Sequence, residues 1–242
     1  MASEKNHKLK YKRVLLKLSG ESLSGSEESG ISVKILNYLT AEIKSVYDLG
    51  AEIGIVVGGG NIYRGLSAQA QGIDAVTGDY MGMLATIINS LALQNSLEKT
   101  GIPTRLLSAI DMNKIAEPFV KRRAVRHIEK KRIVIFGAGT GNPFFTTDTA
   151  GALRALEIGA EVILKGTRVD GVYNKDPEKN KDAKMFSEVS FSEALENNLK
   201  IMDMTAFALC RENKIPVIVF NMDKPGNFLK VVSGEKTGTI VS

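Results

Sequence analysis

Apolar residues along this chain fall into short continuous runs, separated by longer stretches in which they recur every three or four positions. The runs predict buried strands at Arg13–Leu18, Ile53–Val57, Thr104–Ser108, Arg132–Phe136, Glu161–Leu164, Pro216–Phe220 and Gly238–Val241. The stretch after Ser32 is typical of an amphipathic helix that ends before Gly50, with an apolar side made of Val33, Leu36, Leu39, Ile43 and Val46. Strands that alternate with helices predict an α/β fold, a three-layer αβα sandwich with a mostly parallel central sheet.

The same periodicity predicts further helices in the remaining segments. They are expected at about Asp79–Lys99, Glu117–Lys131, between Gly141 and Gly159, and at Ser192–Glu196, Asp203–Glu212 and Gly226–Val231. A polar, turn-rich segment is expected at Asp170–Ala183. Residues 1–11 predict a mobile N-terminal tail, which leaves residues 12–242 as a single domain.

A glycine-rich turn joins a predicted strand to a predicted helix within Phe136–Glu157. Glycines let backbone N–H groups approach a ligand, and a helix N-terminus carries partial positive charge, so this turn favours a phosphate site. It is neither a dinucleotide fingerprint, because Asn142 stands at the third glycine position, nor a Walker A loop. Asp148 would repel a phosphate, which predicts a cation, Mg²⁺ or an ammonium, between the two. A tight turn with Thr147 or Asp148 as helix N-cap would explain the same residues without a ligand.

Three predicted strands end in residues suited to phosphate. These ends are Lys17–Gly20, Gly58–Asn61 and Gly137–Thr147. In open α/β sheets, ligands bind at the carboxyl ends of the strands. The coincidence of three such ends favours a phosphate site over a purely structural turn.

Composition narrows the class of protein. The chain has 242 residues, of which 43% are hydrophobic, enough for one large α/β domain or two small ones. No apolar run approaches the roughly 20 residues of a membrane span, and the first residues, MASEKNHKLKYKR, lack the apolar segment of a secretory signal. The single cysteine, Cys210, excludes an intramolecular disulfide and a multi-cysteine metal site. These features favour a cytoplasmic enzyme with no membrane partner.

The charge balance is basic. The net charge is +5, and basic residues cluster in Lys8–Arg13 and Lys121–Arg132. Such an excess suits a phosphorylated small substrate or nucleic acid. A solvated helix face would explain the same runs without a ligand.

Six motifs occur in order along the chain: KLSGE, VVGGGNIYRG, GDYMGMLAT, GAGTGNPFFTTDTA, LKGTRVDGVYNKDP and MD. Together they resemble the bacterial uridylate (UMP) kinases, which have the amino-acid kinase fold, and the match runs through Arg13–Val241 without a large gap. Glutamate, carbamate and acetylglutamate kinases share the glycine turns and the lysine, but not GTGNPFFTTD together with GDYMGM. The resemblance implies transfer of a phosphoryl group from ATP, with Mg²⁺, to UMP in pyrimidine nucleotide biosynthesis. The acceptor part would lie at about residues 12–160 and the ATP part at about 161–242.

The resemblance also implies roles for individual residues. The catalytic set would be Lys17, which bridges the β- and γ-phosphates of ATP, with Arg64, and with Asp148 and Asp203 holding Lys17. Asp203 could equally be only the N-cap of its helix. ATP would contact Lys17, Leu18, Ser19, Gly20, Gly60, Arg64, Thr167, Tyr173 and Asp176, with Tyr173 against the adenine. UMP would contact Gly59 through its phosphate, Asp79 through its ribose, and Thr140, Gly141, Asn142, Pro143, Phe144, Phe145, Thr146 and Thr147. Thr140 and Asn142 would lie near the uracil edge. No metal site made of protein side chains is expected.

Partners follow from the same resemblance. A homohexamer and inhibition by UTP are implied, whereas GTP activation is not assumed, because Gly25–Gly30 contains two acids where a glycine-rich turn is usual. Two alternatives remain open. A carboxylate or carbamate kinase of the same fold would not need Asp79, because its acceptor has no ribose. A nucleotide-sensing regulator that binds nucleic acid through Lys121–Arg132 would leave Lys17, Asp148 and Asp203 without roles.

Overall fold

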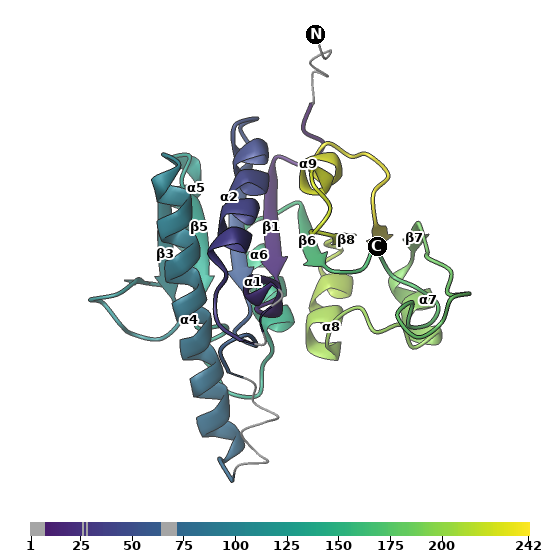
Figure 1. The fold of residues 1–242 in the computed structure, drawn as a ribbon, viewed down its shortest axis with the longest axis horizontal. Coiled ribbons are helices and arrows are strands. Elements are labelled where there is room, and N and C mark those ends of the chain that lie inside the picture. Colours follow the sequence, from purple (N-terminus) through teal and green to yellow (C-terminus); the bar gives the residue numbers. More distant parts are fainter. Residues whose placement is uncertain (1–7, 26, 28, 64–71) are drawn as a thin grey trace.

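A computed structural model describes residues 8–25, 27, 29–63 and 72–242 (Figure 1). Within these residues, nine strands form one sheet in the order β4-β3-β5-β2-β1-β6-β8-β9-β7. The strands are β1 Arg13–Leu18, β2 Glu52–Val57, β3 Thr104–Ser108, β4 Glu117–Pro118, β5 Ile133–Gly137, β6 Val162–Thr167, β7 Glu188–Val189, β8 Val217–Asn221 and β9 Thr239–Val241. Neighbouring strands are parallel except β8 and β9, so the predicted mostly parallel sheet is confirmed.

Helices cover both faces of the sheet. They are α1 Glu21–Ser24, α2 Val33–Tyr47, α4 Ala75–Lys99, α5 Lys121–Glu129, α6 Thr147–Ile158, α7 Phe191–Glu196, α8 Met204–Glu212 and α9 Asn227–Val232. One hydrophobic cluster joins the sheet to α2, α4 and α9, and a second joins it to α5, α6, α7 and α8. The predicted three-layer αβα sandwich is therefore confirmed, and α4 packs over β3 and β5 in one of the two helix layers (Figure 1).

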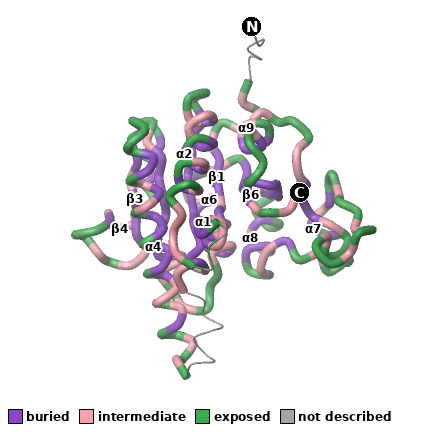
Figure 2. The backbone as a smooth tube through the Cα atoms, viewed as in Figure 1, coloured by how far each residue is buried: buried purple, intermediate pink, exposed green. Residues whose placement is uncertain are grey.

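Alternation along the central strand divides the core between the two faces. Leu16 and Leu18 pack in the cluster with α2 and α4, whereas Leu15 packs in the cluster with α6 and α8. Buried residues consequently fill the interior of the sheet and the inner sides of the helices (Figure 2). Since side chains repeat every second residue in a strand, Lys17 follows Leu15 onto the α6 face.

The order of the strands places β1 at the centre of the sheet. Strands β2, β5, β3 and β4 lie on one side of β1, and β6, β8, β9 and β7 lie on the other. Helix α6 connects β5 to β6 and so carries the chain from the first group to the second. A functional residue on α6 therefore sits between the two halves of the sheet.

Several predicted boundaries were wrong. Residues Glu117–Pro118 form β4 and the helix starts only at Lys121, because a residue before proline disfavours the helical region. Helix α4 begins at Ala75, capped by Asp74 through the Thr77 N–H at 3.0 Å, rather than at Asp79.

Two details of the helix predictions also needed correction. The N-cap of α6 is Thr146, not Thr147 or Asp148. Val33 is 70% exposed, because it lies about 100° around the helix from the other apolar residues of α2 at 3.6 residues per turn.

The predicted N-terminal tail, residues 1–11, lies partly outside the described residues. Of its described part, Lys10 and Tyr11 donate backbone hydrogen bonds to the Val232 carbonyl at 3.0 and 3.3 Å. Leu9 and Tyr11 also pack against the core. This part of the tail is therefore attached to the end of α9.

Candidate active site

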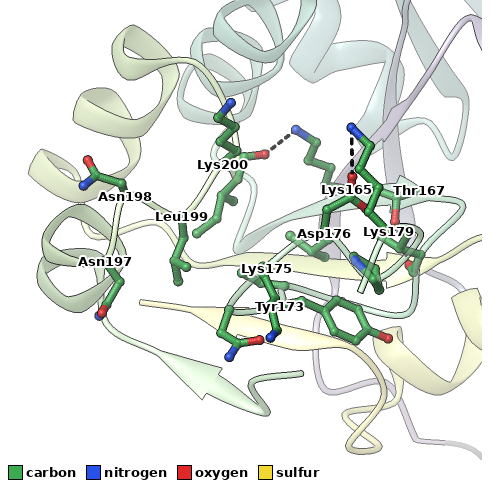
Figure 3. Close-up of a pocket in the computed structure, with 17 residues that line it drawn as sticks. Lys165, Thr167, Tyr173, Lys175, Asp176, Lys179, Asn197, Asn198, Leu199 and Lys200 are labelled. Carbon is green, nitrogen blue, oxygen red and sulfur yellow. Dashed lines mark hydrogen bonds and ion pairs between the residues drawn. The ribbon is translucent and has the colours of Figure 1, made fainter. Parts of the chain in front are cut away.

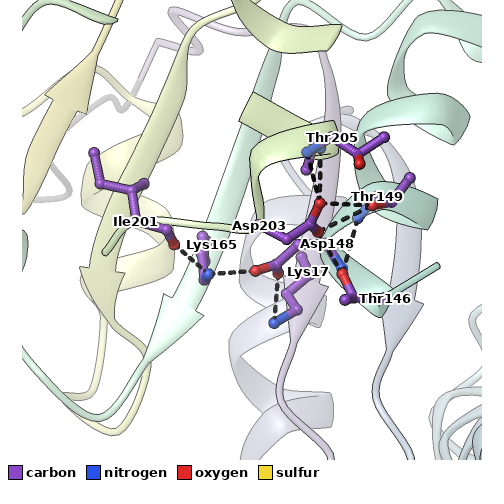
Figure 4. A network of polar contacts seen from close by, with 9 residues as sticks. Lys17, Thr146, Asp148, Thr149, Lys165, Ile201, Asp203 and Thr205 are labelled. Carbon is purple, nitrogen blue, oxygen red and sulfur yellow. Dashed lines mark hydrogen bonds and ion pairs between the residues drawn. The ribbon is translucent and has the colours of Figure 1, made fainter. Parts of the chain in front are cut away.

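A lysine, an aspartate and a second lysine form a largely buried ionic cluster toward the carboxyl ends of the two central strands (Figure 4). The parallel register of β1 and β6 places Lys17 beside Lys165. Asp148, in the first turn of α6, lies between them, with its two oxygens 2.8 Å from the Lys17 Nζ and 2.7 Å from the Lys165 Nζ. The three side chains are each only 15–16% exposed. The predicted Lys17–Asp148 contact is thus present, and the cation expected beside Asp148 is an ammonium.

Burial and charge act against each other in this cluster. Burial raises the pKa of Asp148, but the ammonium groups of Lys17 and Lys165 lower it further, so the net pKa lies below its usual range. Burial lowers the pKa of Lys165, against the opposing effect of Asp148. With all three groups charged, the cluster carries one net positive charge, which suits a phosphate.

Asp203 does not contact Lys17, which corrects the predicted role. Its Oδ1 caps α8 by accepting the N–H groups of Thr205 and Ala206 at 2.9 and 3.0 Å. It also accepts the hydroxyl hydrogens of Thr146 and Thr149 at the start of α6 (Figure 4). Because Thr146 in turn caps α6 through the Asp148 and Thr149 N–H groups, Asp203 fixes the helix turn that carries Asp148.

The glycine-rich strand ends pack closely against one another. A Cβ on Gly20 would lie 2.6 Å from the Gly58 oxygen and from the Gly60 nitrogen, so only glycine fits where the end of β1 meets the loop after β2. The turn after β5 holds Ala138 at φ 60°, a left-handed conformation that is unusual outside glycine. The hydroxyl of Thr86 on α4 accepts the Ala138 N–H at 2.8 Å and so supports that turn.

Most residues predicted to bind UMP surround one cavity of about 460 Å³. Gly59, Asp79, Thr140, Phe145, Thr146 and Thr147 line it. Gly60, predicted to contact ATP, lines this cavity instead. The lining also includes Tyr63, Gly82 and Thr86, which the sequence did not single out.

Four predicted UMP residues do not line this cavity: Gly141, Asn142, Pro143 and Phe144. The backbone of Asn142 forms hydrogen bonds within its own turn. Its N–H donates to the Thr140 hydroxyl oxygen, and its carbonyl accepts the Thr140 hydroxyl hydrogen, both at 3.1 Å. The Asp79 carboxylate accepts the Phe144 N–H at 2.7 Å. Asp79 therefore lines the cavity and also supports the backbone of Phe144, which has a φ of 71°.

Lys165 of the ionic cluster also lines a larger cavity of about 610 Å³ (Figure 3). The predicted ATP residues Thr167, Tyr173 and Asp176 line it together with Lys165. Leu18 is fully buried, and neither it nor Gly20 lines any of the cavities described here. Arg64 lies outside the described residues.

A small cavity of about 230 Å³ shares lining residues with both of these cavities. It shares Lys165 and Thr167 with the larger cavity and Glu21 with the smaller. Its other lining residues are Lys17, Ser19, Ser22, Gly166 and Arg168. Two small molecules could therefore meet beside the ionic cluster.

A divalent cation fits this site only if phosphate groups supply most of its ligands. No group of three or more potential metal-binding His, Cys, Asp or Glu side chains occurs among the described residues. Both oxygens of Asp148 contact ammonium groups, and both oxygens of Asp203 accept hydrogen bonds. Since Mg²⁺ keeps several waters and is often held by substrate phosphates, these side chains suit a metal carried by a nucleotide.

Lys165 and Arg168 are the main site residues that sequence reasoning missed. Lys165 lies two residues after Ile163 on the α6 face of β6, as Lys17 lies two residues after Leu15 in β1. The position of Lys165 beside Lys17 follows from the register of β1 and β6, which a single sequence does not reveal.

A small cavity lined by paired lysines on parallel strands shares lining residues with two larger cavities, which suits phosphoryl transfer between two bound molecules in an enzyme of α/β type. The model of the amino acid kinase family matches residues 12–221, and the chain belongs to that family.

Comparison with solved structures shows which members of this family the chain resembles. A UMP kinase from Bacillus anthracis is 43% identical with a TM-score of 0.93, covering 96% of both chains. A UMP kinase from Ureaplasma parvum is 42% identical with a TM-score of 0.91, covering 96% of this chain and 98% of that one. A uridylate kinase from Archaeoglobus fulgidus is 28% identical with a TM-score of 0.74, covering 95% and 99%. The resemblance to bacterial UMP kinases is confirmed, and the two alternative functions are not favoured.

Proposed function

We propose that this protein is a kinase that transfers the γ-phosphoryl group of ATP to UMP, giving ADP and UDP. The observation that carries the proposal is the Lys17–Asp148–Lys165 cluster, whose two lysines line the small cavity that shares lining residues with both larger cavities. UMP would occupy the cavity lined by Gly59 and Asp79, and ATP the cavity lined by Tyr173 and Asp176. This division supports an acceptor part at about residues 12–160 and an ATP part at about 161–242.

Catalysis in this proposal is positioning combined with charge stabilisation. Charge spreads over the equatorial oxygens of a phosphoryl group in transit, and donors already in place stabilise it without reorganisation. Lys17 and Lys165 supply ammonium groups on one side of the path, and the Arg168 side chain lines the same small cavity. Asp148 keeps the two ammonium groups together, and Asp203 keeps Asp148 in place through Thr146 and Thr149.

No general base is required. UMP would attack through a phosphate oxygen, and a phosphate monoester with a second pKa of about 6 is already a dianion at neutral pH. Of the described residues, His127 lies in α5, where its ring bonds to Glu117 and Arg132 and lines none of the three cavities. Mg²⁺ bound with ATP would supply further positive charge to the phosphate oxygens.

The proposal is tested by measuring ADP and diphosphate products with ATP and each of UMP, dUMP, CMP and AMP, and with glutamate and carbamate as acceptors. UMP should be preferred, and dUMP should be weaker if Asp79 accepts hydrogen bonds from both ribose hydroxyls. Turnover of glutamate or carbamate without turnover of UMP would refute the proposal. UTP, whose inhibition is suggested by the resemblance, belongs in the same assay.

Helix α4 supports the proposal that copies of the chain assemble. From Ala75 to Leu97 it has a single charged residue, Asp79. Its side facing away from the sheet exposes an apolar stripe, defined here as Val76, Tyr80, Leu84, Ile88 and Leu91, each 38–50% exposed. A helix that is apolar on both sides is normally covered on both sides. We propose that the same stripe on a second copy covers it, within the hexamer that the resemblance suggests, and that the assembly is cytoplasmic. No described helix is long and apolar enough to cross a membrane.

A further inference from the structure

Two buried asparagines lie behind the glycine loop at the end of β2. Asn61 follows the loop directly and is 3% exposed, and Asn89 lies in α4 and is fully buried. Their amide groups bond reciprocally, with Nδ2 of Asn61 3.0 Å from Oδ1 of Asn89 and Nδ2 of Asn89 2.7 Å from Oδ1 of Asn61. Neither residue lines any of the three cavities of the site, so neither can touch a substrate there.

The remaining amide hydrogens of this pair hold two backbone carbonyls. Asn89 donates to the Gly58 carbonyl at 2.7 Å, and Asn61 donates to the Gly30 carbonyl at 2.7 Å. A carbonyl can only accept, so the amide nitrogen of each asparagine must face it, and the reciprocal bonds then follow. All four amide hydrogens are used, which makes the pair a fully satisfied buried network with one defined orientation.

The bond from Asn89 sets the direction of the next backbone N–H. No described peptide bond is cis, and in a trans peptide the C=O and the N–H point in opposite directions. Because the Gly58 carbonyl is turned toward Asn89, the Gly59 N–H is turned away from it. No acceptor among the described residues takes this N–H, and Gly59 lines the cavity of about 460 Å³.

Close packing leaves the loop little freedom to choose another orientation. A Cβ on Gly59 would lie 2.8 Å from the Ala85 Cβ and from the Gly82 oxygen, both in α4. The Gly58 N–H is held by the Leu18 carbonyl at 3.0 Å. The peptide before Gly58 is therefore fixed by β1, and the Gly58–Gly59 peptide that follows it is fixed by Asn89.

We propose that the Asn61–Asn89 pair is a positioning device for the proposed reaction: it orients the Gly58–Gly59 peptide so that the Gly59 N–H donates to the phosphate of the acceptor nucleotide. This inference rests on the proposed function of the cavity. Asn89 acts on the carbonyl directly, and Asn61 holds the Asn89 amide in the required rotamer.

The test compares Asn89→Asp with wild type in two measurements: UMP binding by calorimetry without ATP, and steady-state kinetics with each nucleotide varied. A carboxylate at position 89 cannot donate to the Gly58 carbonyl and would repel it, so the peptide should turn. UMP affinity and kcat/KM for UMP should fall roughly 10–100-fold, the range expected when a hydrogen bond to a charged group is lost. The KM for ATP should change less than threefold.

Two further variants keep the test decisive. Asn61→Ala leaves the Asn89 donor in place but frees its rotamer, so it should weaken UMP selectively by a smaller factor even if Asn89→Asp does not fold. Ser96→Ala is the matched control, because Ser96 is also buried in α4, accepts a hydrogen bond from Thr40 at 2.8 Å, and lines none of the three cavities. It should lower the melting temperature without changing UMP affinity.

The outcomes separate the inference from the proposed function. If wild type binds UMP but forms no UDP, the proposed reaction fails, while the binding measurements still judge the asparagine pair. If both asparagine variants lower the melting temperature but bind UMP as wild type does, the pair is only structural and the inference is overturned. An equal loss of UMP and ATP affinity in both variants would overturn it as well.

Discussion

At the scale of single residues, Asp148 holds together two lysines that would otherwise repel each other. The register of β1 and β6 forces Lys17 and Lys165 side by side in a region where each is about 15% exposed. Like charges that close are unfavourable unless an opposite charge compensates them. The carboxylate is thus needed for stability before any substrate binds.

Replacing Asp148 by asparagine should therefore cost stability as well as activity. Loss of one member of a buried ionic cluster typically destabilises by about 3–5 kcal/mol, and the residual exposure of these side chains places the expectation at about 3 kcal/mol. Urea unfolding at pH 7 measures it. Asp48→Asn is the control, because Asp48 is 53% exposed and pairs with Lys44. Exposed ion pairs contribute only about 0–1 kcal/mol to the free energy of unfolding. Similar losses in both variants would contradict the role given to Asp148.

The lowered pKa of Asp148 predicts a pH dependence with a definite sign. A carboxyl group whose pKa is lower in the folded state stabilises the fold fully above its unfolded pKa of about 4, and the contribution disappears as the pH falls through the folded value. The difference in unfolding free energy between wild type and Asp148→Asn should remain constant from pH 7 to about pH 5 and shrink below pH 4. Urea unfolding across this range tests the prediction. A difference that grows on acidification would refute it.

The residues of the site illustrate what the sequence could and could not predict. Lys17 and Asp148 stand in motifs specific enough to predict their pairing, and the structure places them 2.8 Å apart. Lys165 was missed because its role depends on strand register, and Asp203 was given the wrong partner because the N-cap of a helix binds its own backbone first. Asn89 was invisible for a similar reason, since its bonds join α4 to a loop about 30 residues earlier in the chain.

At the scale of elements, two helix caps are joined into one unit. Thr146 caps α6, Asp203 caps α8, and the threonine donates to the aspartate. The first turns of both helices, which come from opposite sides of β6 in the sequence, are thus fixed relative to each other. This arrangement transmits the position of α8 to Asp148.

Asp203→Ala should consequently impair turnover more than its cost in stability explains. Loss of an N-cap costs about 0.5–2 kcal/mol, and two threonine hydroxyls lose their acceptor in addition. Ser190→Ala is the control, because it removes the N-cap and capping box of α7 without touching the cluster. Turnover of UMP, measured at a temperature where both variants are folded, should fall at least tenfold for Asp203→Ala and less than twofold for Ser190→Ala. Equal activities would mean that the cap has no part in positioning Asp148.

The elements themselves were predicted well where apolar periodicity was strong and poorly where turn chemistry decided. Strand β3 has the predicted bounds, and β1 as well, because continuous β-branched and aliphatic runs are buried on both faces of a parallel sheet. The two-residue strands β4 and β7 were missed, since so short a segment carries no periodicity. Helix α4 starts earlier than predicted because Asp74 provides a cap upstream of Asp79.

At the scale of the whole molecule, the apolar stripe of α4 predicts that one charged residue introduced into the stripe dissociates the proposed assembly. Leu84→Glu introduces a carboxylate into the middle of the stripe, where burial against a second copy would be strongly unfavourable. Light scattering coupled to size exclusion should show a smaller particle than wild type. Lys230→Glu, a charge change at an exposed position of α9, should leave the particle unchanged. A wild-type monomer, or an unaltered assembly in Leu84→Glu, would contradict the proposed interface.

The central position of β1 has a consequence for how the protein is made. Its first neighbour, β2, is synthesised soon after it, but Val14 also pairs with Val162, about 150 residues later. At 5–20 residues per second, translation takes roughly 7–30 s to cover that distance. Throughout this interval one edge of β1 lacks its partner, and an unpaired edge is a template for strands of other chains. The C-terminal third of the chain thus completes the middle of the sheet, and a nascent chain interrupted before β6 would leave its most central strand open to aggregation.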